Sequence, residues 1–224
     1  MRTMDNSYKT IRTSGYAEII EKKSRFIGEV HFAASREEAE DIILKAKKRY
    51  FDARHHCFAY IAGKPGGPEE ILRQSDDGEP QGTAGKPMLE LLQGNSLHCA
   101  AAVVTRYFGG TLLGTGGLVR AYSSALREAI ENAEIVLCMK GKELTISCSY
   151  AAAGKLQYLF DAEGFSAPKM LYGGDVEMIL TVPEDSVGKV KKLLSEATDG
   201  KAEIRTEKAA EIFQPVYKPE KSHR

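Results

Sequence analysis

The stretch that determines the fold expected for this chain is residues 75–127, SDDGEPQGTAGKPMLELLQGNSLHCAAAVVTRYFGGTLLGTGGLVRAYSSALR. It opens with an acidic turn at residues 76–80, continues into a short predicted helix, and then into a mostly apolar predicted strand that ends near Arg106. Five glycines follow within positions 109–117, and a long helix is predicted from about Thr115 to Asn132. Glycines in such number cost conformational entropy, so they are usually kept where the backbone needs positive φ or a close approach. This stretch is therefore the predicted functional centre.

Composition indicates a globular protein of one or two domains with no excess of basic residues. The chain has 224 residues, 42% of them hydrophobic, which is enough for one large domain or two small ones. Its 31 basic and 31 acidic residues balance, so a nucleic-acid partner would have to meet a local basic face. No apolar run is long enough to cross a bilayer and the start of the chain has no signal-peptide core, which favours the cytoplasm. The four cysteines show no metal-ligand spacing, so neither a metal nor a cofactor is predicted.

The first part of the chain mixes strands and helices. Apolar alternation predicts strands at 15–21, 24–33 and 54–61, and the apolar run before Arg106 predicts another at 97–107. Ser35, with Glu38 three residues later, predicts a helix that runs to about residue 50. A second helix is predicted from Pro87 to Gly94. Residues 1–14 are polar and are expected to be mobile.

The second part of the chain has a simpler pattern. Strands at 143–150, 166–172, 176–182 and 202–208, with helices at 152–163 and 183–198, give the order βαββαβ, which is ferredoxin-like. The expected fold class is therefore α+β. The predicted domains are 1–136 and 137–212, followed by a flexible tail at 213–224.

The glycine-rich segment has a structural and a functional interpretation. Glycines between a strand and a helix can present free backbone N–H groups and the positive end of the helix dipole to an anion. They can equally permit a tight connection and close packing. The standard nucleotide-binding motifs are incomplete, because Val119 stands where GxGxxG needs its last glycine. The candidate anion or nucleic-acid site comprises Lys86, Arg106, Arg120, Gly109, Gly110, Gly114, Gly116 and Gly117.

The acidic turn offers three carboxylates, from Asp76, Asp77 and Glu79. They could cap the following segment, lock the loop through a salt bridge, or contribute to a magnesium site. Arg106 stands at a strand end beside the glycines, where it could contact a phosphate or pair with one of these carboxylates. The sequence leaves both alternatives open.

No catalytic residue is predicted. His55 and His56 are neighbours on a predicted strand, so their side chains point to opposite faces and cannot act together. The chain has no nucleophile elbow and no HExxH motif. Residue patterns alone do not bring a nucleophile, a base and an oxyanion donor together.

Two segments resemble the signature of a known family. DDGEPQGTAGKPML (76–89) and VVTRYFGGTLLGTGGLVRAYSSA (103–125) are similar to the IMPACT family, in particular to its bacterial members. The resemblance implies a first domain like the second domain of ribosomal protein S5, including a left-handed βαβ crossover. It also implies a second domain like the fifth domain of a translocating elongation factor. Because eukaryotic members resemble translation regulators, it suggests a role in translation, although by analogy of fold rather than from a site.

These observations give one leading hypothesis and two alternatives. The leading one is a translation-associated regulatory or binding protein that contacts RNA or the ribosome through the glycine-rich cleft. The first alternative is an enzyme or sensor for a small phosphorylated ligand, although a complete phosphate motif is missing. The second is a protein-interaction scaffold that docks a protein partner on the ferredoxin-like sheet. No membrane partner is expected, and the oligomeric state is not predicted.

Overall fold

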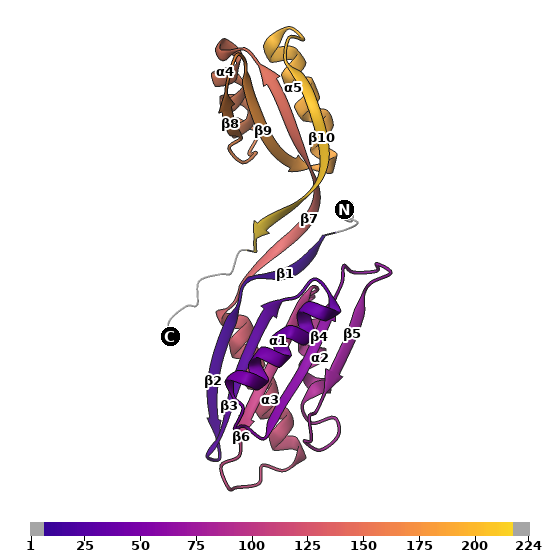
Figure 1. Ribbon diagram of the computed structural model, residues 1–224, viewed down its shortest axis with the longest axis vertical. Helices are drawn as coiled ribbons and strands as arrows, with labels where there is room; N and C mark the ends of the chain where they lie inside the picture. Colours follow the sequence, from indigo (N-terminus) through magenta and orange to yellow (C-terminus); the bar gives the residue numbers. More distant parts are fainter. Residues whose placement is uncertain (1–6, 217–224) are drawn as a thin grey trace. The chain divides into compact units, whose positions relative to one another are not determined.

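The computed structural model describes residues 7–216 and has an α+β fold (Figure 1). Within that range the chain forms two five-stranded sheets and five α-helices. Within the described range it divides into an N-terminal unit, Tyr8–Leu137 with Pro215 and Val216, and a C-terminal unit, Cys138–Gln214 with Ser7. The division falls one residue beyond the predicted boundary at 136/137. No helix among these residues combines the length and apolar character needed to cross a membrane.

The N-terminal unit is built on an antiparallel sheet in the order β2-β3-β6-β4-β5. Its strands are β2 (Gly15–Glu21), β3 (Ser24–Phe32), β4 (His55–Ala62), β5 (Ile71–Ser75) and β6 (Ala100–Tyr107). The central strand β6 is buried along almost its whole length, as its run without polar alternation predicts. The sheet therefore separates two hydrophobic cores.

Helices cover the two faces of this sheet. Helix α1 (Arg36–Arg49) packs its buried residues against Tyr60 and Val103 on one face. On the other face α2 (Gly85–Gly94) and α3 (Thr115–Asn132) form the larger core. Half of the predicted capping box forms at the N-terminus of α1, because the N-cap Ser35 accepts from the Glu38 amide. The Glu38 carboxylate accepts from the amide of Ala34, one residue before the N-cap, rather than from that of Ser35.

The C-terminal unit has the predicted βαββαβ order. It contains most of β7 (Glu134–Cys148), then α4 (Tyr150–Ala162), β8 (Lys169–Tyr172), β9 (Val176–Pro183), α5 (Val187–Thr198) and β10 (Glu203–Pro215). A 3-10 turn, Glu184–Ser186, precedes α5. The strand order β10-β7-β9-β8 brings the first and third strands of the motif together at the centre. One core joins the helices to the inner face of the sheet through residues such as Phe160, Met178 and Leu194.

Several elements differ from the sequence expectations. The prediction of a mobile segment was wrong for β1 (Tyr8–Thr13), which pairs with β7 and buries Tyr8, Thr10 and Ile11. Residues 1–6 lie outside the described part. Strand β5 was not predicted, and β7 begins nine residues before the predicted strand start at 143. Strand β10 continues past the predicted start of the tail at 213, and residues 217–224 are not described.

Candidate functional site

The acidic turn opens a loop whose backbone amides donate hydrogen bonds to the Asp76 carboxylate. One oxygen of the Asp76 carboxylate accepts hydrogen bonds from the amides of Ala84 and Gly85, both at 2.9 Å. The other accepts from the Gly82 amide, also at 2.9 Å. These amides lead into α2, which has no side-chain cap at Ala84. Asp76 therefore satisfies donors that the start of the helix would otherwise leave free.

Asp77 joins the same loop to the neighbouring strand and helix. Its carboxylate accepts from the His56 amide at 2.7 Å and from Lys47 Nζ at 3.0 Å. Its carbonyl oxygen lies 2.9 Å from His55 Nδ1. The residue has φ 43°, a left-handed conformation that aspartate tolerates better than most side chains. The second carboxylate of the turn is thus also occupied within the fold.

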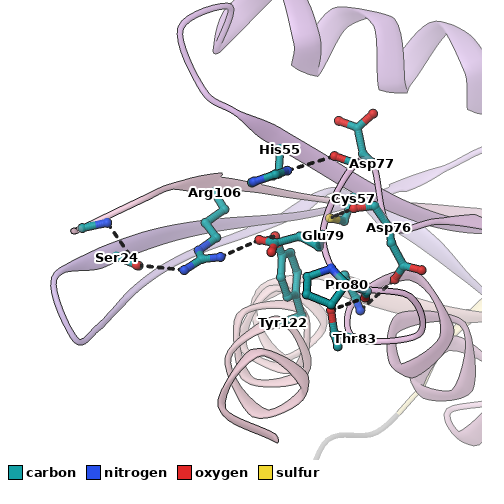
Figure 2. Close-up of polar contacts among 12 residues, drawn as sticks. Ser24, His55, Cys57, Asp76, Asp77, Glu79, Pro80, Thr83, Arg106 and Tyr122 are labelled. Atoms are coloured by element: carbon teal, nitrogen blue, oxygen red, sulfur yellow. Dashed lines mark hydrogen bonds and ion pairs between the residues drawn. The ribbon is translucent and has the colours of Figure 1, made fainter. Parts of the chain in front are cut away.

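Glu79 and Arg106 form a buried ion pair (Figure 2). Arg106 Nη1 donates to Glu79 Oε1 at 2.7 Å, and the two side chains are only 5% and 4% exposed. The Tyr122 hydroxyl donates to the same oxygen at 2.7 Å, and Arg106 Nη2 donates to Ser24 Oγ at 3.2 Å. The guanidinium also lies over the rings of Phe26 and Phe108. Of the two alternatives for Arg106, the geometry is that of the salt bridge that locks the loop.

The ionisation of the loop follows from these contacts. Burial alone raises the pKa of the Asp76 carboxyl, but the amides of Gly82, Gly85 and Ala84 outweigh it and hold that pKa below its usual value. Burial also raises the pKa of the Asp77 carboxyl, but the hydrogen bonds from the His56 amide and Lys47 outweigh it, so that pKa is lowered as well. Burial raises the pKa of the Cys57 thiol far above its usual value. Cys57 is therefore an inert core residue rather than a nucleophile.

The five predicted glycines divide into two groups. A Cβ on Gly109 would lie 2.0 Å from the Lys23 carbonyl carbon, and one on Gly117 would lie 3.0 Å from Leu113 Cβ. Gly109 is therefore required for packing, and Gly117 lies in a tight contact that a side chain would crowd. Gly110 and Gly114 adopt φ 82° and 73° with open space around them, and Gly116 meets only Arg120 Nη1, at 3.6 Å. The second group leaves backbone exposed, which is the property that an anion site requires.

The N-terminus of α3 faces solvent without a protein cap. Its N-cap residue, Gly114, supplies no side-chain hydrogen bond, and the first turn contains no acidic residue. Thr115 and Gly116 are exposed, and so is Arg120 one turn later. Lys86 is exposed in the first turn of α2, 4.0 Å from Glu90. Among the described residues, no hydrogen bond or ion pair links the Lys86 side chain to the glycine loop.

Two lysines beside this loop were missed by the sequence analysis. Lys22 and Lys23 form the turn between β2 and β3, and the backbone of Lys23 packs directly on Gly109. Both side chains are exposed, and in residues 7–216 neither they nor Arg120 form an ion pair. The available signal was the LysLys doublet in a predicted turn. The sequence alone does not show that this turn packs against the glycines.

Comparisons with known proteins match both units. A model of the Impact N-terminal domain matches residues 22–130, and a model of a domain of unknown function, DUF1949, matches residues 146–201. The IMPACT family member YvyE of Bacillus subtilis is 37% identical over 202 residues, covering 90% of this chain and 92% of the relative. The chain belongs to the IMPACT family.

A second family member and a solved structure are also similar to this chain. A family member from Haemophilus influenzae is 38% identical over 82% of this chain and 89% of its own length. A crystal structure of a hypothetical protein is 30% identical, with a TM-score of 0.59, and covers 96% of this chain and 99% of its own. The resemblance found in residues 76–89 and 103–125 is confirmed, and these segments form the acidic loop and the glycine loop described above.

Proposed function

We propose that this IMPACT protein is a translation-associated binding protein of the cytoplasm. In this proposal it holds the phosphate backbone of RNA, on the ribosome or free, at the glycine loop. The observation that carries the proposal is the uncapped N-terminus of α3, with Arg120 against Gly116 and the Lys22–Lys23 turn packed on Gly109. Unpaired amides at a helix start and unpaired cations are the two features with which proteins hold phosphate.

Charge at this end of the N-terminal unit supports an anionic partner. Of the acidic residues in the sequence signature, Asp77 and Glu79 are paired with the cations Lys47 and Arg106, so their charges are balanced within the fold. The Asp76 carboxylate is held by backbone amides. Arg106 acts in the proposal as a support, because its guanidinium is buried against Glu79. The contacts would come from Lys22, Lys23 and Arg120, with Lys86 as a further cation.

One observation favours a protein as the alternative partner. Three apolar side chains in the α1–β4 and β6–α3 connections are exposed: Phe51 by 83%, Phe108 by 46% and Leu112 by 83%. Exposed apolar side chains can form the centre of a protein interface. The two partners differ in their response to salt, since phosphate binding weakens steeply as counterions compete.

The test is binding to ribosomes and to RNA with charge-reversal variants. Ribosome co-sedimentation and RNA gel shifts are run at about 50 and 200 mM salt with the wild type and with Lys22→Glu/Lys23→Glu/Arg120→Glu. Single-stranded RNA binding should weaken with a log–log slope of about −0.7 per phosphate contacted, and the triple variant should lose most of it. Lys192→Glu/Lys191→Glu/Lys189→Glu, on α5, is the matched control with the same change in net charge.

The outcomes separate the candidates. Loss of binding in the first triple variant and not in the α5 variant supports the assigned surface. Equal loss in both variants would mean that net charge alone drives binding, which contradicts the site. Binding of ribosomes that survives high salt and is lost in Phe51→Ser/Leu112→Ser would favour the protein partner. Absence of binding at micromolar protein in every condition would exclude the proposal.

A further inference from the structure

A separate polar cluster lies on the face of the N-terminal sheet that α1 covers. Ser14 Oγ is 2.8 Å from His31 Nδ1, and His31 Nε2 is 3.1 Å from Glu29 Oε2. Arg49 Nη1, at the end of α1, donates to the same Glu29 oxygen at 3.0 Å. A hydroxyl, an imidazole and a carboxylate are thus connected in series. None of these residues belongs to the acidic loop or to the glycine loop.

Strand pairing builds this series. Gly15 pairs with Val30 and Tyr16 with Glu29, so continuation of the antiparallel register places Ser14 opposite His31. Residues two apart on β3 point to one face, which puts Glu29 beside His31. The Tyr16 ring meets the imidazole edge-on, with centroids 5.4 Å apart. The imidazole is therefore held between a carboxylate and an aromatic ring.

The Glu29 carboxylate is the most deeply buried member of the series. The Glu29 side chain is 2% exposed, and its Oε1 is a buried oxygen with no hydrogen-bond partner among the described residues. In the tautomer that the proposal below uses, Nε2 carries the proton and donates it to the Glu29 carboxylate. Nδ1 is then the acceptor that faces the Ser14 hydroxyl. Ser14 and His31 are partly buried, and the His31 side chain is 14% exposed, so this end of the series lies near the protein surface.

We propose that Ser14 is a nucleophile activated by His31, with Glu29 as the residue that positions the imidazole, and that it reacts with small acyl esters. This goes beyond the binding role proposed above and involves different residues. The arrangement has the roles of a hydrolase triad, in which the base is oriented by a third group. The contact to the hydroxyl is made by Nδ1 rather than Nε2, so the likeness is of roles and not of atom names.

The chemical step balances with no added reactant but water. As the Ser14 Oγ–C bond forms, the hydroxyl proton passes to His31 Nδ1, the ester C–O bond breaks, and the alcohol leaves with that proton. Water then attacks the acyl-serine, giving a proton to Nδ1, and the Oγ–C bond breaks with return of the proton to Oγ. The products are the carboxylic acid and the alcohol.

A fluorophosphonate probe tests the nucleophile directly. In this reaction a bond from Ser14 Oγ to phosphorus forms, fluoride leaves, and the hydroxyl proton passes to His31. Peptide mass spectrometry of the full chain should find the adduct on Ser14. Ser14→Ala should abolish labelling and His31→Gln should slow it roughly 100-fold, as expected for loss of a general base. Ser124→Ala, an exposed serine of α3, is the matched control and should label as the wild type does.

Two further measurements separate catalysis from a structural role. Glu29→Gln should lower the maximal labelling rate while the half-saturating probe concentration stays unchanged, because the probe is not bound by Glu29. Wild-type protein should release p-nitrophenolate from p-nitrophenyl acetate, and Ser14→Ala should not exceed the buffer rate. An unlabelled Ser14 in the wild type at millimolar probe, or ester hydrolysis that persists in Ser14→Ala, would overturn the proposal whatever the outcome of the RNA experiments.

Discussion

The acidic loop at residues 76–85 and the glycine loop at 109–117 belong to one family signature, yet the structure uses them in opposite ways. In the first, all three carboxylates accept hydrogen bonds from the protein. In the second, Gly110, Gly114 and Gly116 leave backbone open to solvent. The two loops are connected by Arg106, whose strand leads into the glycines while its side chain pairs with Glu79. Buried charges such as Glu79 and Arg106 therefore stabilise the fold, whereas the exposed cations beside the glycine loop remain accessible from solvent.

The largest effect should come from breaking the buried pair. Glu79→Ala leaves the Arg106 guanidinium buried without its carboxylate, which typically costs about 3–5 kcal/mol of unfolding free energy. Chemical denaturation measures the loss. The matched control is Glu18→Ala, which removes the exposed pair with Arg25 at 2.8 Å and should cost about 1 kcal/mol or less.

A double variant sharpens this test. Replacing both partners, as in Glu79→Leu/Arg106→Met, should recover much of the loss, because no buried charge is then left unpaired. A Glu79→Ala protein as stable as Glu18→Ala would contradict the view that the acidic loop is a structural device.

The next effect compares two glycines of the same loop. Gly109→Ala forces a Cβ into the backbone of the Lys22–Lys23 turn and should cost about 3 kcal/mol. Gly116→Ala meets only the flexible end of Arg120, and its φ is not left-handed, so it should stabilise by about 0.5–1 kcal/mol. Thermal unfolding should show a lower melting temperature than wild type for Gly109→Ala and a higher one for Gly116→Ala. Equal melting temperatures would contradict the division of the glycines into packing and exposed groups.

The smallest of the three effects depends on pH. The folded pKa of Asp76 is depressed, so its contribution is fully present above the unfolded value of about 3.9 and is lost as pH falls through the folded pKa. Asp76→Asn should therefore be less stable than the wild type by about 2 kcal/mol at pH 7, and the difference should shrink below about pH 4. Melting curves between pH 2 and 7 check this, and a difference that grows in acid would contradict it.

Much of the fold could be predicted because local signals and tertiary packing agree. Helix α3 has the predicted bounds, since glycines precede it and an apolar stripe runs along it. Strand β1 was missed because its sequence, YKTIRT, is polar in appearance while its buried positions depend on pairing with β7, more than a hundred residues later. Strand β5 was missed because an edge strand with exposed residues has little apolar alternation.

The candidate site could be predicted only in part, for a similar reason. The sequence indicates that Arg106 and the acidic turn form charged contacts, but not with which group. Arg106 pairs with Glu79 because folding brings the end of β6 together with Tyr122 and Ser24, which bond to the same two side chains. Ser14 and His31 carry no sequence signal at all, because a cross-strand register brings them together. Chemistry that depends on non-local pairing is not visible in a single sequence.

The Lys22–Lys23 turn places two positively charged residues in a backbone conformation that is unfavourable for lysine. Both residues have positive φ, 45° and 68°, in a two-residue hairpin connection where asparagine and glycine are the comfortable choices. Lysine carries a steric penalty in that conformation, and neither side chain forms an ion pair within residues 7–216 that would offset it. A hairpin tip of asparagine and glycine would relieve this strain but would be neutral. Under the function proposed above, the strain is the cost of placing two positive charges beside the glycine loop.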